Sequence, residues 1–247
     1  MQTRLLTILC AVVLTSHLNL SWSSDQAGQE SPSPSADESG PPKQPYYLTG
    51  KEEVWHTFPS KPALGSPRDQ ADLLITLTLQ NSRTDEQKNE ALHDRHYSIK
   101  LVTDVIATDF ETKYPNTFKV LKNADIDAYF VTAMLKQENG RLRPYVQHPV
   151  LVVSLFTVRN FSYPSGHASG MELQARILQK LFPSLSDALL NRARQIADGR
   201  IVAGVHYASD TEAGLALGDL LFTQLETKSQ FENDLTTAAI KDNLPQR

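Results

Sequence analysis

The chain has 247 residues, of which 40% are hydrophobic and 21% are charged, and its formal net charge is −4. This length and apolar content suffice for one globular domain with a sizeable core and some appended sequence. The weakly negative charge and the lack of any Lys/Arg cluster exclude the basic surface on which nucleic-acid binding depends, so we expect no nucleic-acid partner.

The first 23 residues have the pattern of a secretory signal peptide. Arg4 precedes an apolar stretch over Leu5–Leu14, and Ser21-Trp22-Ser23 offers small residues for cleavage. The single cysteine, Cys10, leaves a lipid anchor as the alternative, which the bulky Leu9 and the short apolar stretch disfavour. We therefore expect a periplasmic or secreted protein. Because no later stretch reaches the ~18 apolar residues of a membrane span, we expect no stable membrane insertion after signal removal.

Residues 24–46 are rich in Ser, Pro, Gly and acidic side chains. They have too little apolar surface to offset the cost of ordering, which predicts a disordered linker. The remainder, 47–247, predicts a single all-α domain, in which Ser66-Pro67 and Thr84 with Gln87 are typical helix starts. Residues 150–158 are almost wholly apolar, so we expect them to be buried, in a form that fits a short strand.

The first motif of chemical interest is Lys136-x6-Arg143-Pro144. Apolar residues at helical spacing precede Lys136 and Asn139-Gly140 follows it, so Lys136 should lie near a helix C-terminus. Pro144 pushes Arg143 out of the helical region and into an extended loop. Taken alone, the two cations also fit an ordinary role, which is to complement the helix dipole.

The second motif is Pro164-Ser165-Gly166-His167, which separates the apolar run from a helical pattern. Ser169 and Glu172 have the spacing of a capping box, which predicts a helix start just after the motif. Small side chains, open backbone N–H groups and an imidazole at the positive end of a helix could together cradle an anion. A turn before a helix often has the same composition without binding anything.

The third motif is Arg200-x5-His206-x3-Asp210. Arg200 lies among apolar residues and should have an anionic partner, because an unpaired buried charge is costly. His206 and Asp210 could meet on one helical face at spacing i, i+4. Alternatively, Ser209 with Glu212 could cap a new helix that starts at Asp210. Both geometries allow a carboxylate to orient the imidazole, and a purely structural His–Asp pair is the alternative.

Together, the motifs K-x6-R-P, P-S-G-H and R-x5-H-x3-D resemble the type 2 phosphatidic acid phosphatase superfamily. Within it they resemble the soluble, secreted class A non-specific acid phosphatases of bacteria. The resemblance covers residues 136–210. It implies an all-α helical bundle of the acid phosphatase and vanadium haloperoxidase type. It also implies a metal-independent phosphomonoesterase that needs no cofactor and that vanadate inhibits.

The resemblance also implies a role for each motif residue. His206 would be the nucleophile that forms a phosphohistidine, Asp210 would orient its ring, and His167 would protonate the leaving group and then activate water. Phosphoryl transfer needs positive charge and hydrogen-bond donors around the three equatorial oxygens. The residues implied for that role are Lys136, Arg143, Ser165, Gly166 and Arg200.

One position departs from the family pattern, because Gly199 stands where many members have Ser before the arginine.

The competing functions are a vanadium-dependent haloperoxidase with vanadate as cofactor, a soluble lipid-phosphate phosphatase, and a non-catalytic phosphate-binding protein. The last is disfavoured by His206, His167 and Asp210, because binding alone needs no nucleophile. The expected partner is a small phosphomonoester; its leaving group and a homo-oligomeric state are left open.

Overall fold

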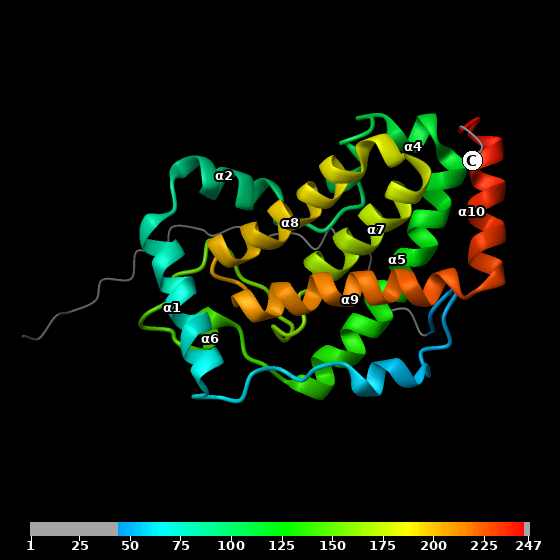
Figure 1. The fold of residues 1–247 in the computed structure, drawn as a ribbon. Coiled ribbons are helices and arrows are strands. Elements are labelled where there is room, and N and C mark those ends of the chain that lie inside the picture. Colours follow the sequence, from blue (N-terminus) through cyan, green and yellow to red (C-terminus); the bar gives the residue numbers. More distant parts are fainter. Residues whose placement is uncertain (1–43, 245–247) are drawn as a thin grey trace, which may run out of the picture. The chain divides into compact units, whose positions relative to one another are not determined.

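Helices form all the regular secondary structure in residues 44–244, the part of the chain that the computed structural model describes, and no strand occurs there. The all-α prediction is confirmed. The predicted signal peptide (1–23) and the predicted linker up to residue 43 lie outside this part. The helices (Figure 1) are α1 (Pro67–Ser82), α2 (Asp85–His93), α3 (Lys100–Thr103), α4 (Phe110–Lys113), α5 (Pro115–Asn139), α6 (Pro144–Gln147), α7 (Gly166–Leu181), α8 (Ser186–Val202), α9 (Ala208–Glu226) and α10 (Ser229–Lys241), with 3₁₀ turns η1 (Glu53–Thr57) and η2 (Pro183–Leu185).

Helix α7 lies at the centre of the core, where it packs against α5, α8 and α9. Its aliphatic side chains point to all sides and are buried, which is typical of a helix surrounded by others. Each such side chain contributes about 1.5–3 kcal/mol to folding. Met171, Leu173, Ile177 and Leu178 are all fully buried.

Two glycines of α9 allow it to approach α7 closely. A Cβ on Gly214 would lie 2.6 Å from the Ser165 carbonyl oxygen, and one on Gly218 would lie 2.6 Å from that of Ser169. Only hydrogen fits at these positions, so the two helices meet backbone to backbone. Their N-terminal ends are also joined directly, because the Ser165 amide donates to the Asp210 carbonyl at 2.9 Å. This contact unites the second and third motifs.

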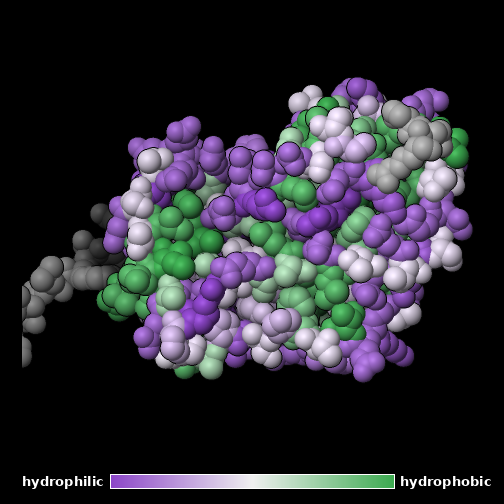
Figure 2. All heavy atoms as spheres, in the orientation of Figure 1, coloured by the Kyte–Doolittle hydropathy of each residue, from purple (hydrophilic) through white to green (hydrophobic). Residues whose placement is uncertain are grey.

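The predicted burial of residues 150–158 is wrong in part. Val150, Leu151 and Val153 are 92%, 50% and 63% exposed, and the segment is neither helix nor strand. The segment connects α6 to α7 over the surface, and the side chain of Gln80 binds the Leu151 carbonyl and the Val153 amide in place of a strand partner. Figure 2 shows hydrophobic side chains gathered over α1 and this connection.

The predicted helix starts at Ser66 and Thr84 are confirmed, because both hydroxyls accept hydrogen bonds from amides in the first turn. The predicted capping box of Ser169 and Glu172 is wrong, since both residues lie inside α7. The cap is Ser165, four residues earlier, where the bond to Asp210 holds the chain in an extended conformation.

Among residues 44–244, no helix has the length and apolarity that crossing a bilayer requires.

Candidate active site

The three motifs meet beside the N-terminal end of α7. Lys136 lies in the last turn of α5, and Arg143 is in extended backbone just before α6, as Pro144 predicted. Arg200 lies near the end of α8. A cavity of about 230 Å³ lies between these elements. The predicted site residues that line it are Lys136, Arg143, Gly166, His167, Arg200 and His206.

His206 and Asp210 adopt the second of the two predicted geometries in modified form. Helix α9 begins at Ala208, so His206 precedes it and Asp210 lies in its first turn. The Asp210 carboxylate accepts from the Tyr207 amide at 2.9 Å and from the Ser162 hydroxyl at 2.5 Å. His206 Nδ1 lies 3.3 Å from the same Asp210 oxygen. The same Asp210 oxygen therefore caps helix α9 and orients the imidazole of His206.

The hydrogen-bond partners of His206 define its tautomer. A carboxylate only accepts, so Nδ1 carries the proton, and Nε2 lies 3.2 Å from the Arg143 guanidinium, which only donates. Nε2 therefore carries the lone pair, which accepts from Arg143, and both residues line the cavity. Burial, and then the charges of Arg143 and Lys136, hold the pKa of His206 well below its usual range. The uncharged form of the imidazole is therefore favoured.

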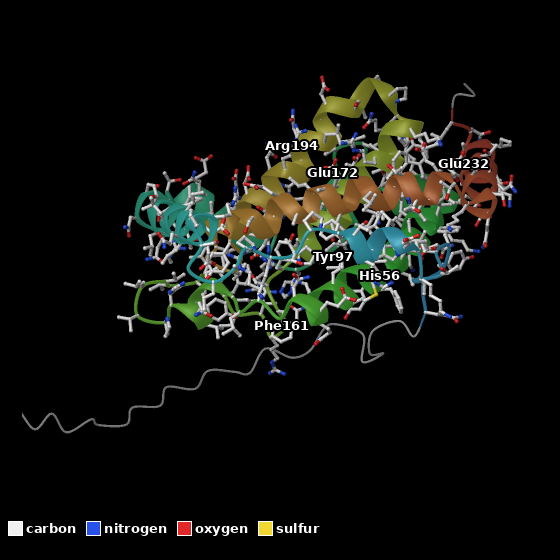
Figure 3. All side chains as sticks on the ribbon, turned by 60° about the horizontal axis from the view of Figure 1, so that its bottom comes forward. His56, Tyr97, Phe161, Glu172, Arg194 and Glu232 are labelled. Carbon is white, nitrogen blue, oxygen red and sulfur yellow. The ribbon has the colours of Figure 1, made fainter. Side chains whose placement is uncertain are left out.

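Three buried cations line the cavity together with His206, and their hydrogen bonds go mainly to backbone carbonyls. Lys136 donates to the backbone carbonyl of Phe161, a residue labelled in Figure 3, at 2.7 Å, and Arg143 donates to the Val205 carbonyl at 2.7 Å. Burial is the main cause that lowers the pKa of Lys136 to about 7, of Arg143 to about 10 and of Arg200 to about 9. A concentration of buried positive charge favours the binding of an anion.

Arg200 does not have the ionic partner that its apolar setting predicted. Its guanidinium lies over the Phe156 ring at 4.9 Å and donates to the Arg95 carbonyl at 3.2 Å, while its buried Nε has no hydrogen-bond partner. An unsatisfied buried donor at a cavity wall is suited to an oxyanion.

His167 also presents an unpartnered atom to the cavity, its buried Nε2. Its ring meets the ring of Tyr97 edge-on, with the centroids 5.4 Å apart. Burial, followed by the charge of Arg200, holds the pKa of His167 well below its usual range. An anion bound in the cavity would oppose the field of Arg200 and raise that pKa, which would prepare His167 to carry a proton.

Ser165 and Gly166 differ in their placement. The Ser165 hydroxyl accepts from the Ala168 amide at the start of α7 and does not line the cavity. Gly166, the first residue of the helix, does line it, and its amide belongs to the free N–H groups of the helix end. The second motif therefore contributes a helix N-terminus and His167 to the cavity.

Arg141 is a central residue of the site that sequence reasoning missed. Its guanidinium binds Asp210 at 2.7 Å, Asp72 at 2.9 Å and Asp69 at 3.0 Å, and it stacks on the Tyr207 ring at 4.0 Å. Its position two residues before Arg143 was the available signal. Its acidic partners on α1 are about 70 residues away, and nothing local in the sequence connects them.

In the described range 44–244, no group of three or more His, Cys, Asp or Glu side chains is arranged to hold a metal ion.

No family model matches the chain. The chain is 33% identical over 135 residues to a non-specific acid phosphatase of Salmonella typhimurium, covering 53% of each chain. It therefore spans about half the length of that relative. It is 26% identical over 208 residues to a non-specific acid phosphatase of Providencia stuartii, covering 78% of this chain and 83% of the relative.

Two solved structures have a similar fold. One is a transmembrane PAP2 type phosphatidylglycerolphosphate phosphatase from Bacillus subtilis, with a TM-score of 0.50, 22% identity, and coverage of 66% of this chain and 87% of that one. The other is a bacterial vanadium-dependent iodoperoxidase, with a TM-score of 0.56, 15% identity, and coverage of 80% and 60%. The resemblance predicted from the three motifs is thus confirmed: the chain is similar in sequence to non-specific acid phosphatases and has the helical fold of the PAP2 phosphatase and the vanadium-dependent peroxidase.

Proposed function

We propose that this protein is a phosphomonoesterase that hydrolyses small phosphate esters through a phosphohistidine at His206. The observation that carries the proposal is the unprotonated Nε2 of His206, a residue that lines one cavity together with Lys136, Arg143 and Arg200. The similarity to proteins named as non-specific acid phosphatases supports it.

The reaction proceeds in two displacements at phosphorus. His206 Nε2 forms a bond to phosphorus as the bond to the ester oxygen breaks, and His167 gives its proton to the departing alkoxide. His167 then takes a proton from water, whose oxygen attacks phosphorus and releases His206 and inorganic phosphate. Asp210 stabilises the cationic ring of the intermediate. The three cations hold the equatorial oxygens, and we infer that the reaction needs no metal because they already supply the charge.

Acid conditions suit this division of roles. His206 must be neutral to attack, and its lowered pKa keeps it neutral as the pH falls. His167 must be protonated, and the bound phosphate raises its pKa in the complex. The signal-like residues 1–23 support a periplasmic or secreted location, where acid conditions can occur.

The test is turnover of p-nitrophenyl phosphate by the purified protein in EDTA. Phosphate release with competitive inhibition by vanadate is expected, since a five-coordinate vanadate on His206 resembles the transition state. Loss of activity in EDTA that a divalent ion restores would contradict the metal-independent mechanism. A panel of phosphomonoesters would then identify the preferred leaving group.

A vanadium-dependent haloperoxidase is the second candidate, favoured by the fold shared with the iodoperoxidase. The residues present fit vanadate, because it is a tetrahedral oxyanion like phosphate and the cations and His206 Nε2 line one cavity. Bound vanadate would supply peroxide activation, while the chain's own cations hold it in place. Halide oxidation by peroxide with added vanadate, in a protein that releases no phosphate, would favour this function.

A further inference from the structure

The cavity continues past the phosphate-binding cations along one face of α5. Residues 125, 128, 129, 132, 133 and 136 of α5 all line it, and their spacing of three and four places them on a single helical stripe. Gly166, His167 and Gly170 line it from α7. A phosphate held at Lys136 therefore leaves room beyond His167, the residue that would protonate the leaving group in the proposed mechanism.

The walls of this extension are apolar and aromatic. They include Ala128, the ring of Tyr97 and the half-exposed Tyr129. Gly170 is required for this arrangement, because a Cβ there would overlap the Tyr97 hydroxyl. Tyr97, labelled in Figure 3, also meets His167 edge-on, so the walls begin where the general acid lies.

A carboxylate, that of Asp125, lies at the end of the extension away from the cations. Tyr97 donates its hydroxyl to Asp125 Oδ1, and Gln174 of α7 is a second hydrogen-bond partner. An ionised carboxylate has about four acceptor sites, so these two partners leave acceptor capacity toward the cavity that Asp125 lines. Burial raises the pKa of Asp125 to about 6, so the carboxylate is mainly ionised at pH 7 and becomes neutral in acid.

The cavity is therefore dipolar, with three cations at one end and a carboxylate at the other. We propose that Tyr97, Asp125, Ala128 and Tyr129 form a leaving-group subsite. It selects phosphomonoesters whose alcohol has an apolar, planar body that ends in an ammonium or another hydrogen-bond donor. It disfavours alcohols that carry a second anionic group. This inference rests on the proposed phosphomonoesterase function and specifies its substrate class.

The test compares phenyl phosphate, 4-(aminomethyl)phenyl phosphate and 4-carboxyphenyl phosphate at pH 7. For each protein, the ratio of kcat/KM for the aminomethyl substrate to that for the carboxyl substrate is measured. Asp125→Asn keeps the shape and removes the charge, so this ratio should fall by about 10–100-fold relative to wild type. Comparing the two proteins cancels the intrinsic reactivities of the leaving groups.

The matched control is Glu138→Gln, which removes the same charge from an exposed position on the same helix. It should keep the wild-type ratio. An unchanged ratio in Asp125→Asn, or an equal fall in Glu138→Gln, would overturn the subsite. Failure of the wild-type protein to cleave phenyl phosphate would instead overturn the proposed function.

A second measurement needs no variant and remains decisive if Asp125→Asn does not fold. The inhibition constants of 4-(aminomethyl)phenylphosphonate and 4-carboxyphenylphosphonate are compared on the wild-type protein at pH 7. The aminomethyl compound should bind at least about 10-fold more tightly, because only it pairs with Asp125. Equal inhibition constants would overturn the proposal.

Discussion

At the residue scale, the chemistry depends on how His206 is held. Its Nδ1 faces the Asp210 carboxylate and its Nε2 faces the Arg143 guanidinium, so the ring cannot turn without losing a charge-assisted hydrogen bond. His167 has no such constraint on its Nε2. In the proposed mechanism, His206 is thus oriented for attack, and His167 is open to exchange protons with substrate and water.

Substitution should separate the two histidines. His206→Ala should abolish turnover of every substrate. His167→Ala should cost about 10²–10⁴-fold on an alkyl phosphate, whose leaving oxygen needs a proton. With p-nitrophenyl phosphate the first step needs no acid, so that variant should show a burst of p-nitrophenol and accumulate an acid-labile phosphoenzyme. Turnover by His206→Ala, with neither burst nor trapped phosphate in His167→Ala, would reverse the assignment.

The pKa of His167 should depend on the bound anion. In the free protein the imidazole should stay neutral to well below pH 6.5, because burial and Arg200 disfavour its charge. Bound phosphate should raise this pKa, since its negative charge favours the imidazolium. Imidazole ¹⁵N shifts, followed by NMR against pH with and without phosphate, measure both values. Identical titrations would show that the anion does not bind beside His167.

Arg141 should affect kcat more than KM. Arg141 does not line the cavity, but its guanidinium binds Asp210. The same guanidinium also forms ion pairs with Asp69 and Asp72. Arg141→Gln would leave clustered carboxylates that repel one another, which weakens the hold of Asp210 on His206. We expect kcat to fall by about 10–100-fold with little change in KM.

Arg141→Lys keeps the charge without the forked donors, so it should retain the fold with an intermediate kcat. Lys88→Gln, at an exposed ion pair, is the control and should change neither constant. A rise in KM at unchanged kcat for Arg141→Gln would show that Arg141 acts on substrate binding instead.

At the element scale, the site depends on the close packing of α9 on α7. Gly218→Ala would place a methyl group 2.6 Å from the Glu172 Cβ and from the Ser169 carbonyl. Such overpacking should destabilise the fold by about 1–3 kcal/mol. For a domain of this size, thermal unfolding should show a fall in Tm of roughly 2–4 °C for each kcal/mol.

Gly199→Ala is the matched control for this substitution. Gly199 also lies in a helix, but an added Cβ would meet Ala91 atoms no closer than 3.8 Å, an ordinary contact. The change should therefore raise stability by up to about 1 kcal/mol through helix propensity. Equal destabilisation by the two substitutions would show that close helix packing is not the cause.

At the scale of the whole molecule, an oxyanion should stabilise the fold. The cavity draws residues from α5, α7, α8 and the segment before α9, so one bound anion connects elements that are distant in sequence. Vanadate at 100 times its Kd should add about 2.7 kcal/mol, or roughly 5–10 °C in Tm. Arg143→Gln should lose most of this shift in a thermal melt, and an equal shift in that variant would place the anion elsewhere.

The sequence by itself determined the helical class, the caps at Ser66 and Thr84, and the three motifs that form the candidate site. These features are local, because spacing, capping and the Arg143-Pro144 pair act within a few residues. Six of the eight predicted site residues line one cavity. Ser165 and Asp210 do not line the cavity. The hydrogen bond from the Ser165 amide to the Asp210 carbonyl joins the N-terminal ends of α7 and α9 beside it.

Only the tertiary structure decided the rest. Val150, Leu151 and Val153 are apolar yet exposed, because a connection between helices runs over the surface. Arg141 and Asp125 look like ordinary surface charges in the sequence. Their environments come from α1 and from Tyr97, which folding brings close from distant parts of the chain. Burial, and with it each pKa, is a property of these long-range contacts, and a local pattern cannot contain it.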